Sequence, residues 1–320
     1  MARRSTSLTP GRQQLLVLLV AGIIFYIVIP QLGNFRHSLS LTTGASLGPL
    51  VAAVVFTGLS YVAAAGNYCL LAVYGLSYPR TLLIQLAGMF VNRLLPAGIG
   101  SISVNYLNLR RSGHNGAQAA SVVAANNSLG IIGNLLLLAV LWVPLHDRLP
   151  GLRIGHPSKI LIIAVGLAVA VIVLGVVFYG RGLSYRTHFF NDIKSFGRQL
   201  LAYRHRRGRL LAALVCSISL TLANVLSLWF CVLAMHISLP FIAVLIVFSF
   251  GTAIGAATPT PGGLGGVEAG LVGGLVAYRV DSAAALAAVL VYRLISYWLP
   301  LVAGAAALLI SQRRGYLSVS

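Results

Sequence analysis

The stretch TPTPGGLGGVEAG, residues 258–270, interrupts a long apolar segment that extends from about residue 241 to residue 280. It holds five glycines, two prolines and Glu268, the only glutamate in a chain of 320 residues. Because proline removes a backbone N–H and glycine weakens a helix, the segment is predicted to form two short helices joined by a non-helical turn. The single carboxylate lies near the start of the second helix.

The composition of the chain indicates that these helices lie in a membrane. Hydrophobic residues make up 58% of the chain and charged residues only 8%, and the mean hydropathy is +0.91. Such a chain has too few polar side chains to cover a water-exposed surface. Several apolar runs are about 20 residues long, which matches the thickness of a bilayer core. We therefore predict an all-α polytopic membrane protein.

A second apolar segment, residues 82–111, is interrupted in the same way. Its break, PAGIG at 96–100, matches PGGLG at 261–265 at an offset of 165, and the helices that follow also align. Both segments are predicted to be re-entrant hairpins, and together they indicate an internal repeat. A non-helical turn is tolerated at membrane depth only where protein or water covers it.

The rest of the chain supplies about six full spans. They are predicted near residues 13–30, 47–74, 115–143, 159–180, 210–235 and 283–310. The predicted organisation is a cytoplasmic basic tail at 1–12, one transmembrane domain at 13–314 with repeat copies at about 82–143 and 241–310, a basic cytoplasmic loop at 181–209, and a C-terminal tail at 315–320.

The distribution of basic residues sets the orientation, because cytoplasmic loops carry an excess of lysine and arginine. With both termini in the cytoplasm of a plasma-membrane protein, sixteen basic residues fall on the cytoplasmic side and five on the outer side. The two repeat copies then enter the membrane from opposite sides, an inverted arrangement typical of secondary transporters. The net charge of +19 accompanies apolar spans, which favours anionic lipid over nucleic acid as the partner.

Three charged residues are embedded in the apolar segments. Glu268 has Arg293 as its obvious partner in the following helix, because an isolated carboxylate in hydrocarbon is costly. The pair either lines a headgroup path, with Glu268 binding a cationic group or carrying a proton, or serves as a structural ion pair. Arg93 brings the embedded charge to plus one, which suits a phosphate, although its side chain can also extend to the cytoplasmic surface.

Other residues of the breaks carry weaker predictions. Gly270 and Gly274 continue a four-residue glycine spacing, which predicts a smooth helix surface for close packing. Asn126 and Asn127 occupy the repeat positions of Tyr292 and Arg293, and either line the same cavity or hydrogen-bond between helices. The remaining prolines and glycines of the two breaks either bind a lipid phosphate at the start of the helix or form a turn without a ligand. They are Pro261, Gly262, Gly263 and Gly265 in the second copy and Pro96, Gly98 and Gly100 in the first.

No cofactor or metal is expected. The three cysteines, Cys69, Cys216 and Cys231, fall in predicted spans without metal-ligand spacing. GGLGGVE has Glu268 where a dinucleotide fingerprint needs a third glycine, and no P-loop lysine follows. The loop 181–209 holds eight basic residues, which either set the topology or gather anionic lipid.

Two stretches carry a family resemblance. PTPGGLGGVEAGLVGGLVAYRVDSAAALAAVLVYRLISYWLPLVAGAAAL (259–306) resembles the signature of the flippase-like transmembrane region of lysylphosphatidylglycerol synthase, the multiple peptide resistance factor. NRLLPAGIGSISVNYLNLRRSGHNGAQAASVV, beginning at Asn92, is similar to the first half of that pattern. The resemblance covers about residues 10–315. Where the family pattern has an acidic residue and a Glu-Arg pair in the first copy, this chain has Ser101 and Asn126-Asn127.

The resemblance implies a lipid flippase or flippase-like transporter, moving an aminoacyl-phosphatidylglycerol type of phospholipid or a polyprenyl-phosphate glycolipid between leaflets. The lysyltransferase domain of bifunctional members is absent from this chain, so we expect no enzymatic activity. Two alternatives remain: a secondary transporter of a small soluble anion, and a non-transporting partner of a lipid-modifying enzyme. The partners considered are membrane lipids, a second copy of the chain and a separate lipid-modifying enzyme.

Overall fold

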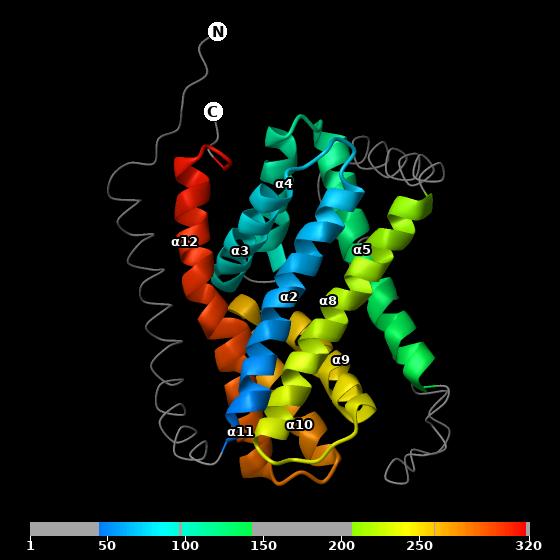
Figure 1. Cartoon of the computed structure of the whole chain (residues 1–320), viewed down its shortest axis with the longest axis vertical. Helices are drawn as coiled ribbons and strands as arrows, with labels where there is room; N and C mark the ends of the chain where they lie inside the picture. Colours follow the sequence, from blue (N-terminus) through cyan, green and yellow to red (C-terminus); the bar gives the residue numbers. More distant parts are fainter. Residues whose placement is uncertain (1–44, 96–97, 143–206, 259, 318–320) are drawn as a thin grey trace, which may run out of the picture. The chain divides into compact units, whose positions relative to one another are not determined.

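The computed structural model describes residues 45–95, 98–142, 207–258 and 260–317, and all regular elements within them are helices (Figure 1). The spans predicted at 13–30 and 159–180 lie outside the described residues. So do the tail 1–12 and the basic loop 181–209, except for the last three residues of that loop.

Within the described residues, four helical stretches are long and apolar enough to cross a membrane, which confirms an all-α polytopic protein. They begin within three residues of the predicted spans, and the last of them passes through a short π-helical segment. In chain order they are α2 (Leu47–Leu71), α5 (Gly116–Trp142), α8 (Arg207–Ala234), and the continuous run of α11 (Ser282–Arg293), η6 (Leu294–Trp298) and α12 (Leu299–Arg313).

The described residues divide into two compact units. Several helices pass from one unit into the other, and each unit is described by itself below. Unit 1 comprises residues 45–57, 89–95, 98–100, 225–258 and 260–303, and unit 2 comprises residues 58–88, 101–142, 207–224 and 304–317.

The interrupted segment of residues 241–280 is a helical hairpin in unit 1. It consists of α9 (Phe241–Ala257), the single turn η5 (Pro261–Gly263) and α10 (Gly266–Ala277). The helices are antiparallel and very close: a Cβ on Gly270 would lie 2.8 Å from the Cα of Gly251, and one on Gly274 would lie 2.9 Å from the Val247 side chain. The packing surface predicted from the glycine spacing is therefore confirmed.

The interrupted segment of residues 82–111 is also a hairpin, formed by α3 (Tyr78–Leu94) and α4 (Ile99–Arg111). In unit 2, Gln85 Nε2 donates to Asn105 Oδ1 at 2.7 Å and Arg80 Nε donates to Asn108 Oδ1 at 3.0 Å, which pairs the two legs in antiparallel register. With 13 and 12 residues, α4 and α10 are about 20 Å long and too short to cross the bilayer. Both breaks are thus confirmed, whereas the inverted relation of the copies stays a prediction.

A buried histidine joins two loops of unit 2. His114 lies in the turn between α4 and α5, and its Nε2 accepts from the backbone N–H groups of Val73 at 3.1 Å and Tyr74 at 3.3 Å. Its Nδ1 lies 3.1 Å from the carbonyl oxygen of Leu109, which fixes the proton on that nitrogen. The ring is 2% exposed, and its burial lowers the pKa of His114 below the ordinary value of about 6.5.

Replacing Gly270 by alanine tests the hairpin packing. The new methyl group would press on the backbone of α9, so we expect the Gly270→Ala protein to lose about 1–3 kcal/mol of stability. The matched control is Gly273→Ala, where nothing lies within 4 Å of the added Cβ and helix propensity improves. The measurement is the thermal unfolding midpoint in detergent. Equal midpoints for the two variants would contradict the packing described.

The His114 contacts predict a pH-dependent stability. Below about pH 6.5 the unfolded chain takes up a proton on this ring while the folded ring stays neutral, so stability falls as the pH is lowered. We expect the difference in unfolding midpoint between pH 7.5 and pH 5.5 to be smaller in His114→Gln than in the wild type. If the pH dependence of stability is unchanged in the variant, titratable groups other than His114 cause it.

Candidate functional site

The turns of the two hairpins line one cavity of about 290 Å³ in unit 1. The first hairpin contributes the end of α3 and the residue before α4, and the second contributes the end of α9, its turn and the start of α10. The lining residues are Asn92, Arg93, Gly98, Gly255, Ala256, Thr258, Thr260, Gly262, Gly263 and Val267. Pro96 lies outside the described residues.

Two positions of the second turn require glycine, because their φ angles are positive and because neighbouring atoms leave no room for a Cβ. Gly262 and Gly263 have φ angles of 63° and 67°, in the left-handed region that other residues rarely adopt. A Cβ on Gly262 would lie 2.7 Å from the ring of Tyr297, and one on Gly263 would lie 2.9 Å from the carbonyl oxygen of Gly255. The turn therefore lies directly against η6 and against the end of α9.

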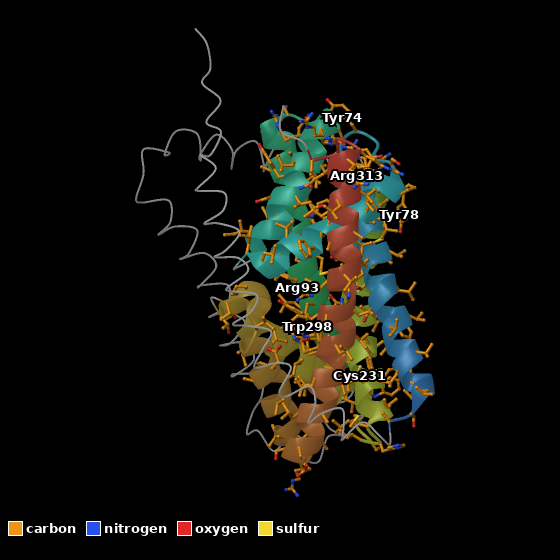
Figure 2. All side chains as sticks on the ribbon, turned by 90° about the vertical axis from the view of Figure 1, so that its left-hand side faces the viewer. Tyr74, Tyr78, Arg93, Cys231, Trp298 and Arg313 are labelled. Atoms are coloured by element: carbon orange, nitrogen blue, oxygen red, sulfur yellow. The ribbon has the colours of Figure 1, made fainter. Side chains whose placement is uncertain are left out.

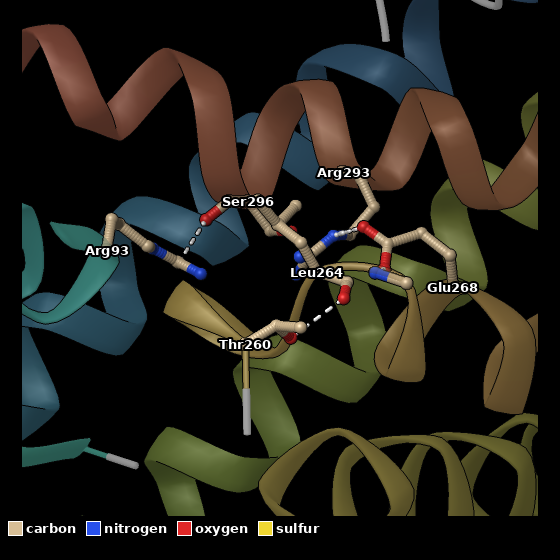
Figure 3. A network of polar contacts seen from close by, with 7 residues as sticks. Arg93, Thr260, Leu264, Glu268, Arg293 and Ser296 are labelled. Atoms are coloured by element: carbon tan, nitrogen blue, oxygen red, sulfur yellow. Dashed lines mark hydrogen bonds and ion pairs between the residues drawn. The ribbon is translucent and has the colours of Figure 1, made fainter. Parts of the chain in front are cut away.

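Glu268 makes two contacts with its two carboxylate oxygens (Figure 3). Oε2 accepts from the backbone N–H of Gly265 at 2.7 Å, which satisfies a free donor at the start of α10. Oε1 accepts from Nε of Arg293 at 2.7 Å. The single glutamate thus fixes the end of the turn and joins α10 to α11.

Arg293 is deeply buried, with a side-chain exposure of 7%, and only part of its guanidinium is satisfied. Its Nη2 is buried and has no hydrogen-bond partner among the described residues. Its guanidinium carbon lies 4.5 Å from the ring centre of Tyr297, a cation–π contact. A buried donor without an acceptor costs about 1–3 kcal/mol, and more when the group is charged.

Arg93 brings a second guanidinium to the same ring. Its guanidinium carbon lies 4.0 Å from the ring centre of Tyr297. Its Nη2 donates to the carbonyl oxygen of Ser296 at 3.2 Å, and its Nε lies 3.5 Å from Sδ of Met89. The side chain therefore lies among protein groups at the hairpin turn rather than extending away from it, and it also lines the cavity.

The sequence explains why Ser296 has a carbonyl oxygen to offer. In a regular helix that oxygen would accept from the backbone N–H of residue 300, which is a proline and has none. The helix adjusts by forming the π-helical turn η6, in which the N–H of Leu299 donates to the carbonyl of Leu294. Pro300 thus supplies an acceptor within the membrane segment, and Arg93 uses it.

Tyr297 was not singled out by the sequence, although it contacts both arginines and the turn. It is 3% exposed. Its position four residues after Arg293 places the two side chains on the same helix face, and this spacing is the signal that could have identified it. Pro300, three residues further on, was equally available as a signal of a local break.

Asn126 and Asn127 belong to unit 2 and form a second polar cluster there. Asn67 Nδ2 donates to Asn126 Oδ1 at 3.0 Å and lies 3.5 Å from Oγ of Ser217, and Asn126 Nδ2 donates to Asn127 Oδ1 at 3.4 Å. The cluster joins α2, α5 and α8, which supports the interhelical interpretation of these amides. Oδ1 of Asn67 is buried without a partner among the described residues.

The cavity in unit 1 has the chemistry of an anion site. Arg93, Arg293 and Glu268 sum to plus one, and Glu268 and Arg293 lie behind the lining rather than in it. Thr258 and Thr260 add hydroxyl groups to the lining. The described residues include no group of three or more histidine, cysteine or acidic side chains placed to hold a metal ion.

These features define a class: a polytopic helical membrane protein in which two re-entrant hairpins share a positively charged cavity. The family model of the lysylphosphatidylglycerol synthase TM region matches residues 14–304. The chain therefore belongs to this family. It is also 22% identical to the UPF0104 membrane protein PH1989 of Pyrococcus horikoshii, over 90% of this chain and 94% of that protein.

A double-mutant cycle tests the coupling of Glu268 and Arg293. Glu268→Gln keeps an acceptor for the N–H of Gly265 but leaves Arg293 as a buried charge without its partner. Arg293→Met likewise leaves the carboxylate of Glu268 as a buried charge without its partner. We expect each single change to cost about 3–5 kcal/mol. The double variant should lose clearly less than the two losses added together. Unfolding by denaturant in detergent measures all four proteins, and additive losses would show that the pair does not act as one unit.

Proposed function

We propose that this protein moves a phosphate-bearing lipid from one leaflet of the membrane to the other. The observation that supports this most strongly is the cavity at the two hairpin turns, where a net positive charge lies within a protein of membrane-spanning helices. A charged headgroup crossing bare hydrocarbon faces a cost of several kcal/mol. A polar cavity at membrane depth lowers that cost.

Arg93 is the residue best placed to contact the phosphate. It is the charged residue of the lining, and the glycines of the second turn leave backbone exposed beside it. Guanidinium groups form strong charge-assisted hydrogen bonds with phosphate oxygens. Glu268 and Arg293 support this arrangement from behind, because they hold the start of α10 and the ring of Tyr297 in place.

The substrate class is an aminoacyl-phosphatidylglycerol type of phospholipid or a polyprenyl-phosphate glycolipid. In either case the mechanism is alternating exposure of the headgroup cavity to the two sides while the acyl or prenyl chain stays in the bilayer. The unsatisfied Nη2 of Arg293 fits a cycle in which the headgroup reaches deeper in one state than in another. The membrane would be the plasma membrane, with both termini in the cytoplasm.

One other transport function fits the same cavity. A small soluble anion would satisfy the net positive charge equally well, and re-entrant hairpins are shared with secondary transporters of such solutes. The membership in a family named for a lipid synthase favours the lipid. A non-transporting partner of a lipid-modifying enzyme would need no charged cavity at the hairpin turns.

Reconstituted vesicles test the proposal. The assay follows fluorescent phosphatidylglycerol, a labelled polyprenyl phosphate and inorganic phosphate in parallel. We expect Arg93→Gln to slow lipid transfer by about 10- to 100-fold, the factor for one charge-assisted contact. Glu268→Gln should slow transfer as well, because the turn loses the residue that fixes it to α11.

Two matched controls separate the site from general effects of charge. Arg279→Gln removes a guanidinium from the loop between α10 and α11, and Asp281→Asn removes a carboxylate while keeping a good helix cap. Both should transfer lipid at the wild-type rate. Wild-type transfer of phosphate ion but not lipid would establish the soluble-anion transporter, and transfer of neither would leave the non-transporting partner. Unchanged lipid transfer in Arg93→Gln would overturn the site assignment.

A further inference from the structure

The second large cavity of the described residues is a groove between α4 and α5 in unit 2. Its volume is about 610 Å³. Most of its wall is apolar, and three polar side chains, Ser103, Tyr106 and Asn127, interrupt it. The remaining lining residues are Ile102, Leu107, Ala120, Val123 and Ala124. The α4 side of this wall follows one helix face, with spacings of three and four residues.

Two arginines extend the same helix face beyond the apolar wall. Arg110 lies four residues after Tyr106, and Arg111 lies four residues after Leu107, and both are exposed. The hydroxyl of Tyr106 and the guanidinium of Arg110 both approach the start of α5: a Cβ on Gly116 would lie 3.3 Å from Oη and 3.8 Å from Nη1. The groove thus has a cationic end with a hydroxyl beside it.

The described residues at this end of unit 2 include several arginines and no acidic side chain. The described residues of unit 2 contain no aspartate or glutamate, because Glu268 and Asp281 both belong to unit 1. Arg80 stacks on the ring of Tyr316 at 4.6 Å, and Figure 2 shows Arg313 at the same end of the unit as Tyr74. An anionic group that reaches this end would therefore meet no acidic side chain among the described residues of the unit.

We propose that this groove binds one glycerophospholipid with an anionic headgroup. One acyl chain lies along the apolar wall of α4 and α5, and the phosphate contacts Arg110 and Arg111. The hydroxyl of Tyr106 lies where it can donate to an ester or phosphate oxygen. The combination of an apolar wall with a cationic end matches the two parts of such a lipid. The site is additional to the cavity in unit 1, and it does not depend on the proposed transport.

Native mass spectrometry of the full chain, stripped of lipid and then mixed with phosphatidylglycerol and phosphatidylcholine of equal chain length, tests the headgroup. Two arginines near an anionic group predict a preference for phosphatidylglycerol of about 30-fold. In the Arg110→Gln/Arg111→Gln protein this preference should fall to about twofold or less. Arg279→Gln is the control and should retain the preference. Equal retention of both lipids by the wild type, or an unchanged preference in the double variant, would overturn the proposal.

A second pair of variants tests the apolar wall. Ala124→Phe fills the groove and should abolish retention of the bound phosphatidylglycerol. Ala306→Phe, on an exposed position of α12 that does not line the groove, should leave it unchanged. If Ala124→Phe does not fold, Ala120→Leu at the exposed edge of the groove should lower retention at least tenfold relative to Ala306→Phe. Equal retention in the groove and control variants would count against the site.

Photo-crosslinking identifies the occupant directly. A benzophenone amino acid placed at position 102, where the wall already carries the large and exposed side chain of Ile102, should add the mass of one lipid to the full chain in phosphatidylglycerol vesicles. A crosslink to a second copy of the chain would show a dimer interface instead. A crosslink to residues 143–206 of the same chain would show that the protein fills its own groove. Either of these results would overturn the lipid site.

Discussion

The arrangement of unit 1 depends on the two hydrogen bonds accepted by Glu268. A carboxylate that is 13% exposed in a membrane segment must be paired, and here one oxygen binds a backbone N–H of the turn while the other binds Arg293. The first bond holds the start of α10, and the second holds that helix against α11. Because the turn contains left-handed glycines that pack against Tyr297, a shift of α10 would also move the wall of the cavity.

Tyr297 links the two hairpins, because its ring packs against Gly262 of the second turn and contacts Arg93 of the first hairpin. Arg293 and Arg93 both lie over its ring, at 4.5 Å and 4.0 Å, so that two positive charges share one aromatic side chain. Arg93 would be poorly fixed by the ring alone. The carbonyl of Ser296, which Pro300 leaves without its usual donor, supplies the second contact. Pro300, in α12, thus makes available the carbonyl oxygen that holds the side chain of Arg93 at the end of α3.

The sequence predicted the elements well because membrane helices are governed by simple patterns. Apolar length identified α2, α5 and α8, and the breaks PAGIG and PGGLG correctly located both hairpin turns. The pairing of Glu268 with Arg293 was also predictable, since the chain offers few partners for its only glutamate. The contact of Arg93 with the helix of Tyr297 was not, because it joins residues more than 200 positions apart in the sequence and depends on how the hairpin turns meet.

The two segments predicted to be repeat copies differ in the chemistry of matching positions. Where the second copy has Tyr292 and Arg293, the first has Asn126 and Asn127, and the structure shows an ion pair in one case and amide hydrogen bonds in the other. An amide can satisfy its neighbours without a counter-charge, so Asn126 and Asn127 need no acidic partner. The second copy must keep Glu268 as long as it keeps Arg293. Arg93 comes from the first hairpin and lines the cavity, whereas the ion pair of Glu268 and Arg293 belongs to the second half, so the two halves contribute unequal parts to a single site.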